Sequence, residues 1–361
     1  MLRRTALVAA LAVVAACSGG DDEIEPAPVV EDAATVELGD PVDGYRITYR
    51  VEERDGDDVT TQEATRLVER PFRSRFEAGE LVRVADFGYF GEREPGDETE
   101  VRTAVPAPSP GDVRADLLDL DGGGAVRRIA GRECQVHTFG AQLLLGTVAD
   151  GGDTETCIDA DGLVLEEVVR DADGIVSRWV ATAVDIEPET TDADFALEGV
   201  AARPAAEGGG SLREVEPTSR SEGQFYELAE VPAGFVHRGR YAVVPPQEAN
   251  PEDENTRAHV IAGVVDVWVR GIDVLVLDQG GTLGRVPPFG GHPNGTPEDE
   301  LSAQYRGVAE SIRSAHANEV RVLLPPGRYV KVIGTLPVDE LIDLLADLTS
   351  SEGEGLVYLD D

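Results

Sequence analysis

The amino-acid sequence predicts an α+β protein in two parts, an antiparallel β-rich first half and a smaller α+β second half. Between about residues 41 and 200, apolar and polar residues alternate and Asp-Gly pairs recur, as in strands joined by tight hairpin turns. Between about 223 and 350, runs dense in Val and Ile combine with two amphipathic helical patterns. Residues 201–222 contain Gly208-Gly209-Gly210 and scattered Ser, Pro and Glu, which predicts an interdomain linker, and residues 351–361 form an acidic tail.

The N-terminal residues have the composition of an export signal. Arg3 and Arg4 precede an apolar run over residues 6–16, which is shorter than the about 20 residues that span a membrane. Cys17 follows small residues directly, and this arrangement resembles the lipobox of bacterial lipoproteins, in which cleavage precedes a cysteine that receives diacylglycerol. The resemblance implies a signal peptide over residues 1–16, lipidation of Cys17 and anchoring at the extracytoplasmic face of the cell membrane. The alternative is an ordinary secreted protein with an incidental Cys17.

Residues 17–40 predict a disordered tether behind this anchor. They consist largely of Gly, Asp, Glu, Pro, Ala and Val without a period. A flexible coil of this length reaches about 25–30 Å. The tether would therefore let the folded part move freely over the membrane surface.

Strands of the first half follow from alternation and turn signals. Tyr45, Ile47, Tyr49 and Val51 alternate with polar residues, which predicts a strand with one buried face, and Asp55-Gly56-Asp57 predicts a turn after it. Further strands are predicted at residues 65–68, 72–77, 81–87, 134–139, 155–158, 163–170 and 175–186. Hairpin turns are predicted at Glu77–Glu80, Asp161-Gly162 and Asp173-Gly174, and a short helix at Asp112–Leu120.

Strands of the second half are predicted at residues 241–244, 258–270, 272–277, 320–324 and 329–333. A helix of about four turns is predicted to begin at Thr296–Asp299, because a Thr N-cap precedes Pro and two acids. Its apolar face would consist of Leu301, Tyr305, Val308, Ile312 and Ala315. A final helix would present Val338, Leu341, Ile342, Leu345 and Leu348 on one face.

The charge of the chain argues against nucleic acid as a partner. There are 31 Lys+Arg against 70 Asp+Glu, for a net charge of -39, and polyanions would be repelled by such a surface. A solvated exterior is the main interpretation of this acidity, and a patch for cationic ligands is the alternative. Lys331 is the only lysine.

Cys134 and Cys157 remain as an even pair once Cys17 is lipidated. In an oxidising compartment this predicts a disulfide, which would stabilise the fold by about 3 kcal/mol in the chain-entropy model. A redox or metal pair is the alternative, but no Cys-x-x-Cys spacing supports it.

Catalytic and metal-binding patterns are sparse. Asp159–Gly162 and Asp171–Gly174 each read Asp-x-Asp-Gly, but they lie between strand patterns and lack EF-hand spacing, so hairpin turns are favoured over calcium loops. No nucleophile elbow, zinc-protease motif or phosphate loop is present. The sequence therefore predicts no enzyme, no metal and no cofactor. The five histidines are scattered: His137, His237, His259, His292 and His316.

Two stretches resemble LolA-like lipoprotein-sorting proteins and RseB/MucB-type regulatory proteins. The first is Gly131–Cys134 followed by Cys157–Leu165, and the second is Pro232–Phe235 followed by Gly327–Leu341. The resemblance implies a half-open antiparallel β-barrel in the first part, whose concave face holds acyl chains or a peptide. It implies that the second domain helps to bind a protein partner, and it brings no catalytic residues.

The expected function is that of a membrane-anchored binding protein, with an acyl ligand or an envelope protein as partner and a regulatory role in envelope signalling as one version. The alternatives are an envelope hydrolase with an unfamiliar site and a structural surface protein without a ligand. The residues expected to face a ligand, with a packed core as their other interpretation, are Tyr45, Ile47, Tyr49, Val51, Phe76 and Phe87.

Overall fold

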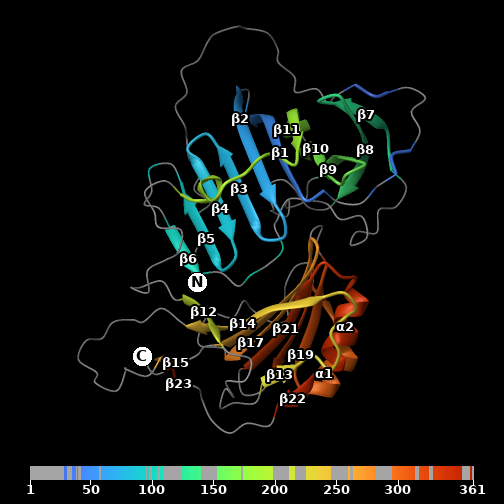
Figure 1. Cartoon of the computed structure of the whole chain (residues 1–361). Coiled ribbons are helices and arrows are strands. Elements are labelled where there is room, and N and C mark those ends of the chain that lie inside the picture. Colours follow the sequence, from blue (N-terminus) through green and yellow to red (C-terminus); the bar gives the residue numbers. More distant parts are fainter. Residues whose placement is uncertain are drawn as a thin grey trace.

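A computed structural model shows two large antiparallel sheets, each built from a continuous stretch of the chain (Figure 1). It describes residues 28–30, 35–37, 39, 42–56, 58–94, 96, 100–103, 106, 108, 123–139, 153–171, 174–197, 211–215, 225–244, 259–260, 263–281, 295–313, 317–324, 328–351 and 358–359. Within these ranges, neither helix has the length and apolar content needed to cross a bilayer.

The first sheet has eleven strands in the order β6-β5-β4-β3-β2-β1-β11-β10-β9-β8-β7. Chain neighbours pair as hairpins from β1 to β6 and from β7 to β11. β6 and β7 lie at opposite edges of the sheet, and β1 pairs with β11. The strands are β1 (Gly44–Asp55), β2 (Asp58–Glu69), β3 (Arg73–Ala78), β4 (Leu81–Asp86), β5 (Tyr89–Arg93), β6 (Glu100–Thr103), β7 (Val126–Ile129), β8 (Arg132–Phe139), β9 (Asp153–Asp159), β10 (Val164–Asp171) and β11 (Gly174–Ile186). A 3-10 helix, η1 (Asp192–Phe195), follows β11.

This sheet curls around its own core. Phe76 on β3 stacks on Trp179 on β11, with ring centroids 5.9 Å apart, although the two strands lie three places apart in the sheet. Because neighbouring strands are about 4.8 Å apart, a flat sheet would hold these rings much farther from each other. The core that results also contains the alternating apolar residues of β1, so the predicted buried face of that strand is confirmed.

The second sheet has eight strands in the order β12-β14-β16-β17-β21-β20-β19-β18. They are β12 (Ser211–Val215), β14 (Val236–Val244), β16 (Gly263–Arg270), β17 (Asp273–Gly281), β18 (Gly295–Pro297), β19 (Val308–Ile312), β20 (Asn318–Leu324) and β21 (Arg328–Gly334). Two short pairs complete the described strands, β13 (Phe225–Glu227) with β22 (Thr349–Ser351) and β15 (His259–Val260) with β23 (Tyr358–Leu359).

The two faces of the second sheet pack differently. One face buries Leu275, Leu277 and Val322 against the helices α1 (Asp299–Tyr305) and α2 (Val338–Ala346), which lie together on one side of the sheet in Figure 1. Residues of opposite parity, such as Val267 and Val276, point to the other face and pack with aromatic residues of the first sheet.

The predicted hairpins of the first half are confirmed where the structure describes them. The turns after β1, β3 and β9 contain Gly56, Gly79 and Gly162, each with positive φ. Tight turns need such a backbone conformation, and glycine adopts it readily because it has no Cβ. The final helix is also confirmed as α2. The predicted helix at Asp112–Leu120 lies outside the described residues.

The predicted four-turn helix beginning at Thr296–Asp299 is wrong at its start and in its second half. Thr296 and Pro297 belong to β18, and α1 begins at Asp299 with Glu298 as its N-cap. It ends at Tyr305, Arg306 follows with a left-handed φ of 51°, and residues from Val308 form β19. The apolar spacing was compatible with either structure, and pairing of β19 with β20 decides for the strand. β-branched residues at both ends of this strand favour that outcome.

Two segments predicted to lack structure contain contacts with the sheets. β12 lies within the predicted linker 201–222 and pairs with β14 as an edge strand. Within the predicted tether 17–40, Val29 bridges to Arg127 on β7, and the backbone N–H of Val30 donates to the Val126 carbonyl (2.8 Å). Edge strands leave backbone groups unpaired, and these segments satisfy some of them. The division into two domains stays a prediction.

Candidate functional site

The two sheets meet where turns of the first sheet contact the face of the second sheet that the helices do not cover. Phe72, in the turn before β3, and Phe87, in the turn after β4, pack edge to face with ring centroids 5.0 Å apart. Phe87 packs in the same way on Tyr241 of β14, again at 5.0 Å. Together with Val267 and Val276 these residues form one apolar cluster. Aromatic residues in the two turns therefore join the sheets.

Arg238 of β14 covers this cluster from the solvent side. Its guanidinium carbon lies 5.3 Å from the ring centroid of Phe72 and 4.7 Å from that of Phe87. A guanidinium at such distances is attracted to the ring faces and leaves its outer edge for other partners. Arg238 is exposed, so its donors stand at the border of the joint.

A cavity of ≈ 620 Å³ opens beside Arg238, and we call it the junction cavity. Its walls carry three arginines and three carboxylates around aromatic rings, a balance of charge that contrasts with the acidic composition of the chain. The lining residues are Glu69, Arg70, Pro71, Phe72, Arg73, Asp86, Phe87, Tyr89, Asp192, Phe195 and Arg238.

Arg73 organises the charged wall of the junction cavity. Its Nη1 lies 3.1 Å from Glu69 Oε1 and its Nη2 2.8 Å from Asp192 Oδ1. Its guanidinium carbon also lies 4.3 Å from the ring centroid of Phe195 on η1. Burial lowers the pKa of Arg73, but the hydrogen bonds to Glu69 and Asp192 outweigh this, so the pKa is raised above its ordinary value. Arg73 therefore stays charged and holds η1 against the first sheet.

A second cavity of ≈ 530 Å³ borders the same 3-10 helix. It is lined by strand residues including Arg46 and Arg75 and, around η1, by Ala193, Asp194, Ala196 and Leu197. Arg75 Nη1 donates to the Ala196 carbonyl (2.9 Å), which holds this chain over the sheet. The η1 segment thus borders two cavities beside the first sheet.

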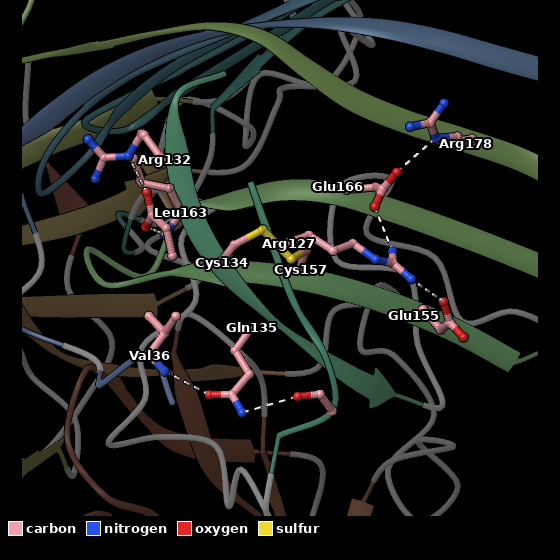
Figure 2. The surroundings of a disulfide bond; sticks show 12 residues. Val36, Arg127, Arg132, Cys134, Gln135, Glu155, Cys157, Leu163, Glu166 and Arg178 are labelled. Atoms are coloured by element: carbon pink, nitrogen blue, oxygen red, sulfur yellow. Dashed lines mark hydrogen bonds and ion pairs between the residues drawn. A yellow bond between two sulfur atoms is a disulfide. The ribbon is translucent and has the colours of Figure 1, made fainter. Parts of the chain in front are cut away.

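The predicted disulfide is present in the structure (Figure 2). Cys134 on β8 and Cys157 on β9 are bonded with a Cα–Cα distance of 5.3 Å, within the usual range of about 4.4–6.8 Å. In the adjoining turn, Asp159 Oδ1 accepts hydrogen bonds from the backbone N–H groups of Asp161 and Leu163 (3.0 and 2.9 Å). This part of the Asp-x-Asp-Gly sequence braces the predicted hairpin.

A buried ion network lies beside the disulfide (Figure 2). Glu166 on β10 is fully buried, with its two oxygens 2.6 Å from Arg127 Nη1 and 2.8 Å from Arg178 Nε. Arg127 also lies 3.3 Å from Glu155, and Arg178 lies 3.3 Å from Glu52. The network links β7 to β10 and β11 across the curl of the sheet, and we assign it to the framework.

Most of the residues predicted to face a ligand lie elsewhere than the junction cavity. Tyr45, Ile47, Tyr49 and Val51 are at most 1% exposed in the core of the first sheet. Phe76 packs against the same core. Only Phe87 lies at the junction cavity. A ligand-facing role for the others stays a prediction, and Cys17 lies outside the described residues.

Sequence reasoning missed Phe72, Arg73, Asp192 and Arg238. Their roles depend on contacts between segments far apart in the chain, and arginines are spread along the whole sequence. The one local signal is Pro71-Phe72, a proline followed by an aromatic residue at a strand boundary. Such a ring cannot bury itself in a turn, and it points to packing against another element.

Comparison with known proteins gives matches among solved structures. No protein-family model matches the chain, and no curated protein sequence matches it. A chain of the MucA/MucB complex of Pseudomonas aeruginosa is 15% identical, with a TM-score of 0.30, and the match covers 86% of this chain and 94% of that one. A crystal structure of MucB matches at 12% identity and a TM-score of 0.28, over 86% and 93% of the two chains.

A LolA-superfamily protein from Nitrosomonas europaea matches at 11% identity and a TM-score of 0.25, over 46% of this chain and 94% of that one. The chain is thus similar to both groups of proteins that its sequence resembles. With TM-scores this low, no ligand, partner or residue role is carried over from them.

Proposed function

We propose that this protein is an extracytoplasmic, membrane-anchored binding protein without enzymatic activity, and that a protein partner binds at the junction cavity. The observation that carries the proposal is the composition of that cavity. Arg70, Arg73 and Arg238 stand among aromatic rings and carboxylates where the two sheets meet, and arginine and aromatic residues are those that dominate binding energy at protein interfaces.

The compartment and the anchor are supported by the sequence and by the disulfide. Disulfides persist mainly in oxidising compartments, and Cys134 and Cys157 are bonded. The leader with Arg3, Arg4 and Cys17 has the order expected of a lipoprotein signal. A tether behind Cys17 would hold the junction cavity near the membrane surface.

A protein partner is favoured over an acyl chain. Tyr45, Tyr49 and Trp179, which would line a barrel for acyl chains, are at most 2% exposed and belong to one hydrophobic core. The junction cavity carries charged groups that an alkyl chain would desolvate without pairing. A carboxylate-rich or arginine-bearing protein surface would instead pair with them.

Photo-crosslinking in the native host tests the proposal. A photoreactive phenylalanine analogue replaces Asp192, which is fully exposed at the border of the junction cavity. Glu133 is the control position, because it too is an exposed acid in a surface ion pair, on the distant strand β8. We expect one discrete protein adduct from position 192 and none from position 133.

Lipids are extracted from the protein purified from the same host, and the extract is analysed by mass spectrometry. A stoichiometric acyl ligand beyond the anchor, together with the absence of an adduct at position 192, would replace the proposal by acyl carriage. Equal adducts at the two positions would show that the surface is not selective, and they would also overturn it.

A further inference from the structure

A small cavity of ≈ 230 Å³ lies at the edge of the second sheet, and we call it the Asp266 cavity. It is separate from the junction cavity. Asp266 and Trp268 on β16 have the opposite parity to Val265 and Val267, so they point to the face away from the first sheet. The lining residues are Glu227, Leu228, Val231, His237, Arg240, Asp266 and Trp268.

Asp266 is an unevenly paired buried carboxylate. It is 1% exposed, and its Oδ1 accepts a hydrogen bond from Arg240 Nε (2.8 Å) and lies 3.1 Å from His237 Nε2. Its Oδ2 is buried and has no hydrogen-bond partner among the residues that the structure describes. Buried polar atoms are nearly always paired, and an unpaired charged oxygen is costly. This oxygen is therefore suited to a donor from outside the chain.

The charge around the Asp266 cavity favours a cation. Asp266 and Glu227 supply two negative charges, and Arg240, which pairs with both, supplies one positive charge. The remaining ionisable group is His237 at the rim, whose side chain is 34% exposed. With neutral His237 the lining is negative overall, and the rest of the chain adds to this potential, since its net charge is -39.

The other walls of the Asp266 cavity are aromatic and apolar. Trp268 lies with its ring centroid 5.2 Å from that of His237. Leu228 and Val231 provide an aliphatic wall, and Val231 is one of four large apolar residues that are exposed in the described part of the chain: Val29, Val231, Val236 and Val308. A tryptophan face attracts cations, and an aliphatic wall packs an alkyl stem.

We propose that the Asp266 cavity binds one basic side chain of a partner protein or peptide. The alkyl stem of that arginine or lysine packs on Leu228, Val231 and Trp268, and its terminal N–H group donates to Asp266 Oδ2. At ≈ 230 Å³ the cavity is smaller than the roughly 300–1,000 Å³ of small-molecule sites, so it suits a single side chain. This subsite does not depend on the proposed role of the junction cavity.

Fluorine NMR on the full chain tests this proposal, because the chain contains two tryptophans. With 5-fluorotryptophan, Trp268 reports on the Asp266 cavity, while Trp179, in the core of the first sheet, is an internal reference. The probe is N-acetyl-arginine amide, and its neutral isostere N-acetyl-citrulline amide is the control. We expect the arginine probe alone to give a saturable shift of the Trp268 signal, while the Trp179 signal stays unchanged.

Three substitutions sharpen the test. Asp266→Asn should weaken binding by about tenfold or more, as expected on loss of a charge-assisted hydrogen bond. Glu227→Gln, at a half-exposed position, should keep the fold and weaken binding about twofold to fivefold. Glu133→Gln removes the same charge from the first sheet and should change nothing.

An equal response to the citrulline probe, or a wild-type Trp268 signal that never saturates, would overturn the proposal. So would an unchanged affinity in Glu227→Gln, or in Asp266→Asn with the Trp179 and Trp268 signals of a folded chain. An effect of Glu133→Gln equal to that of Glu227→Gln would show general charge attraction and would also overturn it.

Discussion

At the scale of single residues, charge occupies two environments in this protein. Arg128 and Glu133 form an exposed pair on neighbouring strands, and such pairs contribute about 0–1 kcal/mol. Glu166, in contrast, is fully buried between Arg127 and Arg178. Removing one partner of a buried ion network leaves uncompensated charge in a low-dielectric interior. The same residue type therefore differs greatly in its effect on stability.

Glu166→Gln should lower the free energy of unfolding by about 3–5 kcal/mol, because two buried guanidinium groups lose their shared carboxylate. Glu133→Gln is the matched control and should cost about 1 kcal/mol or less. Chemical denaturation of the full chain measures both. Similar small losses for the two variants would show that the Glu166 network is hydrated in solution.

At the scale of secondary-structure elements, short apolar patterns left the choice between helix and strand to tertiary contacts. Hairpins with Asp-Gly turns and the strand of Tyr45–Val51 were predictable, because a two-residue period and a positive φ are local properties. The strand β19 was not predictable, since its pairing with β20 decides that these residues form a strand and not a helix. Gly307, directly before β19, allows the chain to approach β20 closely, because a Cβ added there would lie 2.1 Å from the Leu323 carbonyl oxygen.

Gly307→Ala should therefore cost about 3 kcal/mol, as an overpacked contact against a backbone atom that cannot move aside. Gly271→Ala is the control, because its φ is +59° but an added Cβ meets nothing within 4 Å, and its strain should cost about 1–2 kcal/mol. Thermal unfolding of the two variants gives the comparison. A larger loss in Gly271→Ala would contradict the assigned pairing of β19 with β20.

At the scale of the whole molecule, the two sheets depend on a small aromatic joint. Phe87 contacts Phe72 and Tyr241 and lies beneath Arg238. The sheets bury separate cores of their own on either side of it. Loss of the joint should therefore loosen the relation between the sheets while each sheet stays folded.

Phe87→Ala should separate the unfolding of the two sheets into two calorimetric transitions and increase the radius of gyration in small-angle scattering. Phe76→Ala is the control, because Phe76 packs against the core of the first sheet and not at the joint. It should lower the free energy of unfolding of the chain in a single transition, by about 3 kcal/mol or less because its ring is only partly buried, and leave the radius unchanged. A single transition and an unchanged radius in Phe87→Ala would mean that other contacts hold the sheets together.

The sequence by itself determined the local features of this protein: the alternating strands, the Asp-Gly hairpins, the final helix, the pairing of Cys134 with Cys157 and the acidic surface. Each follows from a short window or from composition. Tertiary structure alone decided that Arg238 meets Phe87, and that Asp266 is buried with one oxygen that no described residue pairs with. This contact and this burial depend on how two curved sheets bring distant residues together and exclude water from them. No periodicity in the chain encodes such long-range arrangements.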